Sequence, residues 1–88
     1  MAEKTHDVIG QINLGQLVDI DMFLQIINKY SGDYTLLHNG YVANAKSLLG
    51  IVTLDLTNDL MLVGDNLQDI SEIEKLTNEL RIHKLLKE

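Results

Sequence analysis

The chain has 88 residues, of which 45% are hydrophobic and 23% are charged, and it contains no cysteine. These values are typical of one globular domain, residues 1–88, and the lack of cysteine excludes disulfides, thiol catalysis and cysteine-based metal sites. The formal net charge of −6 argues against a nucleic-acid binder, because such proteins depend on Lys and Arg to contact phosphates, and a solubilising surface is the simpler explanation of the acidity.

The first half of the chain predicts a strand, a helix and a hairpin. Residues 7–12 alternate imperfectly between apolar and polar side chains, which indicates a strand that ends in a turn at residues 13–16. Residues 17–30 predict an amphipathic helix. Its apolar positions follow helical spacing: Leu17, Ile20, Phe23, Leu24, Ile27 and Tyr30. Two short apolar runs then flank Asn39 and Gly40, a pair suited to a two-residue type I′ turn because both positions need positive φ.

The second half predicts a short helix, a strand and a longer helix. Residues 47–54 predict the short helix, residues 60–63 the strand, and the turn-forming residues 64–66 its end. The last helix is expected to open at Asp69, with Glu72 as the acid of its first turn. One side of it would carry Ile70, Ile73, Leu76, Leu80 and Leu85. The order β-α-β-β-α-β-α predicts an α+β domain, in which a four-stranded antiparallel sheet has its helices on one face.

The stretch NAKSLLGI, residues 44–51, joins a helix start, a phosphorylatable hydroxyl and apolar residues. Ser47 can cap the short helix by accepting a hydrogen bond from a free backbone N–H, and this role alone contributes about 1 kcal/mol. A phosphoryl group on Ser47 would lie at a helix N-terminus beside Lys46. The short helix carries three neighbouring apolar residues, Leu48, Leu49 and Val52. A short helix buries three such side chains less easily than two, so we expect Leu48 to be exposed.

The histidines and paired carboxylates do not predict a metal or cofactor site. His6, His38 and His83 fall in three different segments, without the spacing of metal ligands. Asp19 and Asp21 stand two positions apart on the first helix, so their carboxylates diverge. We interpret them as an acidic helix start.

Residues 44–51 resemble the regulatory-serine motif of the HPr-like phosphocarrier domains of the bacterial sugar phosphotransferase system, usually N-[AL]-K-S-[IL]-M-G-[IL]-[ML]. The resemblance covers nearly the whole chain, and residues 38–42 are similar to the neighbouring strand-turn-strand of that family. It implies an HPr-like open-faced β-sandwich. The family's G-L-H-A-R-P run is replaced by LGQLVD at residues 14–19. Gln16 thus stands at the place of the phosphorylated histidine, and Val18 at the place of its arginine.

This departure predicts a protein that is not an enzyme. A histidine nitrogen can carry a phosphoryl group and an amide cannot. Asp19 and Asp21 would also repel a phosphate from the first helix. The glutamine is shared with the Crh type of the family, although the following arginine and proline are lost. The resemblance therefore implies a regulatory or adaptor protein that is phosphorylated at Ser47 by an HPr kinase/phosphorylase and binds a transcription factor. The residues expected to bind a protein partner are Lys46, Leu48, Leu49, Val52 and Gln16.

Two other hypotheses remain open. One is an oligomerising or structural HPr-fold module without phosphorylation, as a monomer or a homodimer. The other is an active phosphocarrier that uses a different residue, which the missing histidine, arginine and proline oppose. Residues 1–7 lack the pattern of a signal peptide, and no apolar run reaches the roughly 18 residues that span a bilayer. We therefore expect no membrane association and a cytoplasmic location.

Overall fold

A computed structural model describes residues 6–38, 40–54, 60–65 and 71–87 of the chain. Its elements, in chain order, are β1 (His6–Ile12), α1 (Leu17–Ile27), β2 (Asp33–His38), β3 (Tyr41–Asn44), α2 (Leu48–Val52), β4 (Leu60–Asp65), α3 (Ser71–Ile82) and β5 (Leu86–Lys87). This order confirms the predicted α+β arrangement and adds one short strand after the last helix.

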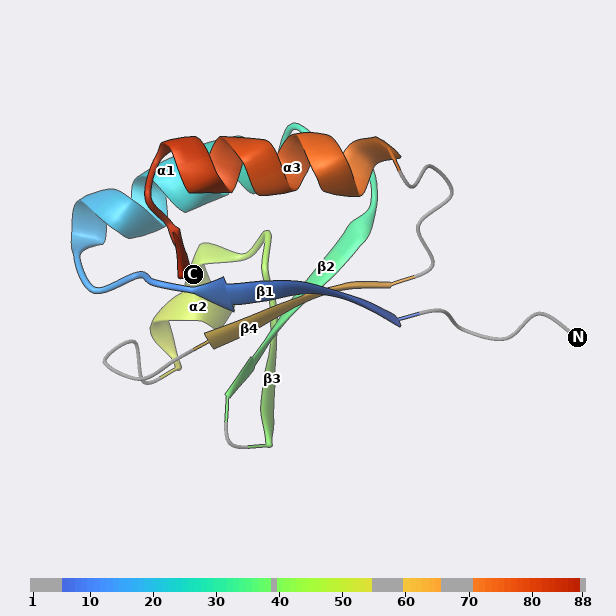
Figure 1. The fold of residues 1–88 in the computed structure, drawn as a ribbon. Helices are drawn as coiled ribbons and strands as arrows, with labels where there is room; N and C mark the ends of the chain where they lie inside the picture. The colour runs from blue at the N-terminus through green and yellow to red at the C-terminus, as the bar shows by residue number, and fades with distance from the viewer. Residues whose placement is uncertain (1–5, 39, 55–59, 66–70, 88) are drawn as a thin grey trace, which may run out of the picture.

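The strands form one antiparallel sheet in the order β3-β2-β4-β1-β5. Figure 1 shows α1 and α3 lying over one face of this sheet. The short helix α2 contacts α1 and β3. The opposite face of the sheet has no helix over it within the described residues, which makes the molecule an open-faced β-sandwich (Figure 1).

The helices and the sheet share a single core of buried apolar side chains. Phe23 and Ile27 of α1, Ile51 of α2 and Leu76 of α3 are fully buried in it. The predicted apolar face of α1 is wrong at Leu17, which is 81% exposed, and Ile26 is buried instead. Leu17 is the first residue of the helix.

Helix α1 ends at Ile27, three residues before the predicted end. The side-chain amide of Asn28 donates to the carbonyl of Leu24 at 2.9 Å, and Lys29 and Tyr30 continue in tighter turns of the backbone. The hairpin of β2 and β3 has the predicted register, with His38 opposite Tyr41 and with Gly40 at φ 83°. Asn39 and the predicted helix start at Asp69 and Ile70 lie outside the described residues.

Strand β4 extends through Gly64 and Asp65, where the sequence predicts a break. Gly64 is paired with Asp7 on one side and with Tyr34 on the other, and Asp65 is paired in the same way. A central strand with a partner on both sides can hold residues whose local preference is for turns, because ladder hydrogen bonds outweigh that preference.

The additional strand β5 exists because α3 ends at Ile82, before Leu85, which the sequence analysis places on the apolar side of the helix. The backbone N–H of Leu85 donates to the carbonyl of Leu80 at 2.9 Å, and that of Lys84 to Arg81 at 3.1 Å. This is the hydrogen-bond pattern of a Schellman motif, whose turning residue needs a positive φ. Lys84 takes that conformation, at φ 60°.

Strand β1 accommodates β5 through a glycine. A β-bulge interrupts the register between Val8 and Gly10, and Gly10 has φ 149°. A Cβ atom at this position would lie 2.9 Å from Cδ1 of Leu86. Glycine therefore meets both the backbone conformation and the close approach of β5.

Candidate functional site

Gln16 is the N-cap residue of α1 and is exposed. Its backbone N–H donates to the carboxylate of Asp19 at 3.2 Å, and its carbonyl accepts from the N–H groups of Asp19 and Ile20. The carboxylate of Asp19 thus already complements the positive end of the helix. The second acid, Asp21, accepts a hydrogen bond from Gln25 at 2.9 Å. This helix start contains neither a phosphorylatable nitrogen nor a cation for a phosphoryl group.

Ser47 is the N-cap residue of α2, as the sequence predicts. Its Oγ accepts a hydrogen bond from the backbone N–H of Gly50 at 3.2 Å, and its carbonyl accepts from Ile51. The backbone N–H of Ser47 donates to the carbonyl of Asn44, which ties the helix start to the end of β3. The serine is half-buried, so its hydroxyl caps the helix at the protein surface.

Lys46 is held by the chain that follows α1. Its ammonium group donates to the carbonyl of Tyr30 and lies 5.8 Å from the centre of the Tyr34 ring. The residue is half-buried. The positive charge expected beside a Ser47 phosphate is therefore engaged with Tyr30 and Tyr34, although it remains on the residue adjacent to Ser47.

The apolar residues of α2 divide into one core residue and three surface residues. Ile51 is fully buried, whereas Leu48 is 53% exposed and Leu49 is 78% exposed. Val52 is exposed as well. The exposure predicted for Leu48 is therefore confirmed.

Helix α1 adds two exposed apolar residues beside α2 that the sequence does not predict there. Leu17 and Val18, which follow Gln16, are both largely exposed, and α1 contacts α2. The sequence does indicate the exposure of these two residues, because Leu17 stands directly after the N-cap and Val18 lies off the predicted apolar face. We call these five exposed residues the helix patch: Leu17, Val18, Leu48, Leu49 and Val52.

A second group of contacts joins α3 to the chain between α1 and β2. The carboxylate of Glu72 accepts hydrogen bonds from the Tyr34 hydroxyl, from the backbone N–H of Gly32 at 3.1 Å, and from both the N–H and the hydroxyl of Ser31. Glu72 was predicted as an acid of the helix start. It does lie in the first turn of α3, and it also binds a distant loop, because folding places that turn against residues 31–34.

Glu79 makes a matching contact two turns further along α3. Its carboxylate binds the ammonium of Lys29 and accepts a hydrogen bond from the hydroxyl of Tyr30. The hydrogen bond from Lys29 lowers the pKa of Glu79 below its usual value. Burial, with the neighbouring Glu79, raises the pKa of Tyr30 to about 12.

Burial also raises the pKa of Tyr34, in concert with its hydrogen bond to Glu72. For Glu72 itself, burial acts to raise the pKa, but the hydrogen bonds from Tyr34, Gly32 and Ser31 outweigh it, and the pKa is lowered. Both glutamates are thus held as carboxylates. They fix the chain segment whose Tyr30 carbonyl holds Lys46.

Within the described ranges, no group of three or more His, Cys, Asp or Glu side chains is arranged to hold a metal ion. His38 lies in β2 and His83 in the turn after α3. Among the helices of the described residues, none is both long and apolar enough to cross a membrane.

No protein-family model matches the chain, and no curated protein sequence matches it. Two solved structures are similar over nearly the whole length. HPr-C-His from Thermoanaerobacter tengcongensis shares 20% identity over 94% of each chain, with a TM-score of 0.65. The histidine-containing phosphocarrier protein of a Mycoplasma shares 14% identity over 98% of this chain and 100% of the other, also with a TM-score of 0.65. At these identities the likeness establishes an HPr-like fold.

Proposed function

We propose that this chain is a non-catalytic, HPr-like regulatory or adaptor protein that is controlled by phosphorylation of Ser47. The observation that carries the proposal is the position of Ser47. Its hydroxyl caps α2 at the surface, and the next two residues, Leu48 and Leu49, are exposed leucines. A modification at this serine would change the charge directly beside an apolar surface, which is how a local switch alters the affinity for a partner.

The start of α1 supports the non-catalytic part of the proposal. Gln16 stands where the resemblance places the phosphorylated histidine, and the neighbouring Asp19 carboxylate occupies the helix start. An amide does not form the phosphoramidate that a phosphocarrier needs. The exposed Gln16 instead contributes a polar edge to the helix patch.

The modification would transfer the γ-phosphoryl group of ATP to Oγ of Ser47, with release of ADP and of the hydroxyl proton. The phosphate oxygens would then lie near the backbone N–H groups that open α2, beginning with that of Gly50. The ammonium of Lys46 would strengthen the site only by leaving the Tyr30 carbonyl. We therefore expect a change in surface charge without a change of fold.

The test is intact-mass spectrometry after incubation with an HPr kinase/phosphorylase and ATP. We expect one phosphoryl group on the natural chain and none on Ser47→Ala. Thr53→Ala is a matched control, because it also removes an α2 hydroxyl that makes a hydrogen bond, here to the Gly50 carbonyl at 2.7 Å. No addition to the correctly folded natural chain would contradict phosphorylation by this kinase.

The adaptor role has a separate test, which uses the transcription factor of carbon catabolite control as the partner. We expect the phosphorylated chain to bind more tightly than the unmodified chain, and Leu49→Ser to weaken that binding. Equal affinity of the two forms would contradict regulation through Ser47.

The helix patch favours a second candidate function, an oligomerising module without phosphorylation. Five large apolar side chains on two contacting helices are a surface that a second copy could cover. Sedimentation over a range of concentrations tests this role. A dimer that Leu49→Ser disrupts and Ser47→Ala leaves intact would support the module and replace the regulatory proposal.

The third hypothesis, an active phosphocarrier, has its own test. An acid-labile phosphoryl label from phosphoenolpyruvate and the upstream phosphotransferase enzyme would support it.

A further inference from the structure

Strand β3 forms one edge of the sheet, and no strand of the described residues pairs with its outer side. Figure 1 shows the β2–β3 hairpin reaching away from the layer of α1 and α3. An edge strand presents unpaired N–H and C=O groups, and proteins ordinarily protect it with charge, proline, a β-bulge or a very short strand. The opposite edge, β5, is protected in two of these ways, because it has two residues and one of them is Lys87.

The sequence of β3 has none of these protections. Residues 34–45, which contain β3 and most of β2, include no Asp, Glu, Lys or Arg, although such residues make up 23% of the chain. The chain has no proline, and β2 and β3 pair without a shift of register. On β3, the side chains of Tyr41 and Val42 are 69% and 70% exposed. A regular, uncharged and partly apolar edge is the kind that pairs with another strand.

The register shows which backbone groups of β3 face outward. The N–H of Ala45 donates to the carbonyl of Tyr34 at 3.0 Å, across the same ladder. Hydrogen-bonded and non-hydrogen-bonded pairs alternate along an antiparallel ladder. Ala43 is therefore bonded to Leu36, and the N–H and C=O of Val42 point away from β2. Val42 thus offers a donor and an acceptor side by side at the open edge.

We propose that β3 pairs antiparallel with β3 of a second copy, so that the two sheets join across a two-fold axis at Val42. The two Val42 residues would exchange both hydrogen bonds, each N–H donating to the C=O of the other copy. The strand's own sequence selects this occupant. In this register each exposed Tyr41 lies opposite Ala43 of the other copy, a large side chain against a small one in both directions.

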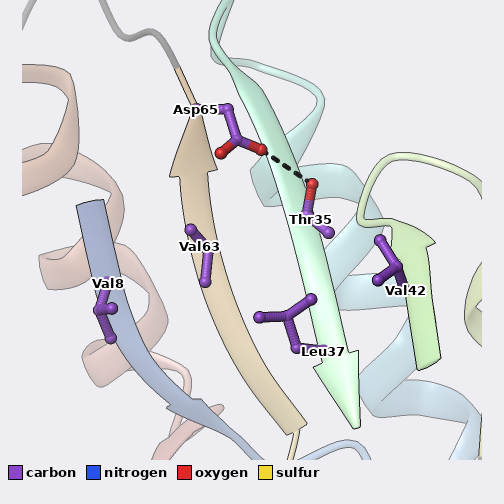
Figure 2. A pocket seen from close by; sticks show the side chains of 6 residues that line it. All are labelled: Val8, Thr35, Leu37, Val42, Val63 and Asp65. Atoms are coloured by element: carbon purple, nitrogen blue, oxygen red, sulfur yellow. Dashed lines mark hydrogen bonds between the residues drawn. The ribbon is translucent and has the colours of Figure 1, made fainter. Parts of the chain in front are cut away.

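On the open face of the sheet, the same axis brings the two Val42 side chains together. Figure 2 shows Val42 on β3 at the side of an apolar hollow of about 400 Å³, which Leu37, Val63 and Val8 also line. The pairing would shield Val42 from water and place the hollows of the two copies side by side. This surface involves neither Ser47 nor the helix patch, so the proposal stands independently of both candidate functions.

The charges of the chain determine how the pairing depends on salt. Each copy has a net charge of −6, but the joined strands themselves carry no charged side chain. Repulsion between the copies therefore comes from more distant charges, which salt screens. Added NaCl should strengthen the dimer.

The experiment measures association and backbone protection of the full chain. An interface of two four-residue strands is small, so we expect dimers in sedimentation equilibrium only as the protein concentration rises from about 20 µM to about 1 mM. Over the same range, exchange of the Val42 amide proton with water, followed by NMR, should slow by about twofold or more. The Ala43 amide is the internal control, because it already bonds within the sheet and its exchange should stay constant.

Variants separate this edge from the helix patch. Val42→Lys places two like charges together at the axis and should abolish the dimer. Leu49→Lys makes the same change of charge at an exposed position of α2 and should leave the dimer intact. Val42→Pro removes the outward N–H without adding charge and should also abolish the dimer. Its fold should persist, because that N–H makes no bond to β2.

Three outcomes would overturn the proposal. A chain that is monomeric at about 1 mM, with Val42 exchange independent of concentration, would show that β3 does not pair with itself. A dimer that survives both Val42→Lys and Val42→Pro but not Leu49→Lys would place the interface at the helix patch. Exchange at Val42 that slows only when an uncharged extended peptide is added would assign the edge to a different protein.

Discussion

At the scale of single residues, the cap on α2 gives Ser47 a role in stability that is separate from any modification. Ser47→Ala removes the oxygen that accepts from Gly50, so the free energy of unfolding should fall by about 1 kcal/mol. Ser47→Asp keeps an acceptor at the cap and should stay close to the natural chain. Urea unfolding measures both. If the alanine variant were as stable as the aspartate variant, the hydrogen bond would not stabilise the helix.

The two glutamates of α3 predict a dependence of stability on pH. The pKa of Glu72 and that of Glu79 are lowered in the folded chain, so each carboxylate contributes stability above its unfolded pKa of about 4.3. That contribution is lost as the pH falls through the lowered folded value. Stability falls in acid because the unfolded chain binds these protons more tightly than the folded chain does.

Thermal unfolding between about pH 3 and pH 7 tests whether the two glutamates stabilise the fold less in acid. The double variant Glu72→Gln with Glu79→Gln should be less stable than the natural chain at neutral pH, and the difference should shrink in acid. Glu74→Gln changes an exposed glutamate of the same helix and serves as the control. A difference that stays constant over the range would contradict the proposed linkage.

At the scale of elements, the end of α3 contains a residue with an unfavourable backbone conformation. Lys84 has φ 60°, a region that glycine occupies without a steric cost. Lys84→Gly should therefore raise the free energy of unfolding by about 0.5 kcal/mol. The same substitution at Lys75, inside α3 and exposed, should lower it by about 1 kcal/mol. Urea unfolding of the two variants gives the comparison, and a loss of stability at both positions would contradict this account of the helix end.

The elements that the sequence predicts well are those that local chemistry determines. Ser47 caps its helix through a residue three positions away, and the β2–β3 hairpin depends on a two-residue turn. The elements that it misses depend on distant partners. Strand β5 forms against β1, and β4 is prolonged by pairing on both sides.

The same distinction applies to the candidate site. The exposure of Leu48 follows from the shortness of α2 and was predictable. The engagement of Lys46 with Tyr30 and the binding of Glu72 to residues 31–34 join segments 16 and about 40 positions apart. No periodicity within either segment indicates such contacts, because the first joins the chain before α2 to the chain after α1, and the second joins α3 to the chain before β2.

At the scale of the whole molecule, the net charge of −6 should make stability depend on salt. Excess like charge destabilises the compact state, and salt screens it. Raising NaCl from about 20 mM to about 0.5 M at pH 7 should therefore raise Tm. Near the isoelectric point of about 4.8 the same addition should have little effect. An equal rise at both pH values would point to a general salt effect instead of charge repulsion.

The order of the sheet also bears on how the chain folds as it is synthesised. Strand β1 is made first, yet its two partners are β4 and β5, from residues 60–65 and 86–87. The β2–β3 hairpin and α1 can form early, because their contacts are local. β1 can pair only after the chain beyond residue 60 has left the ribosome. Its core residue Ile12 and the partly buried Ile9 are exposed until then, and this interval is when a chaperone would act on the chain.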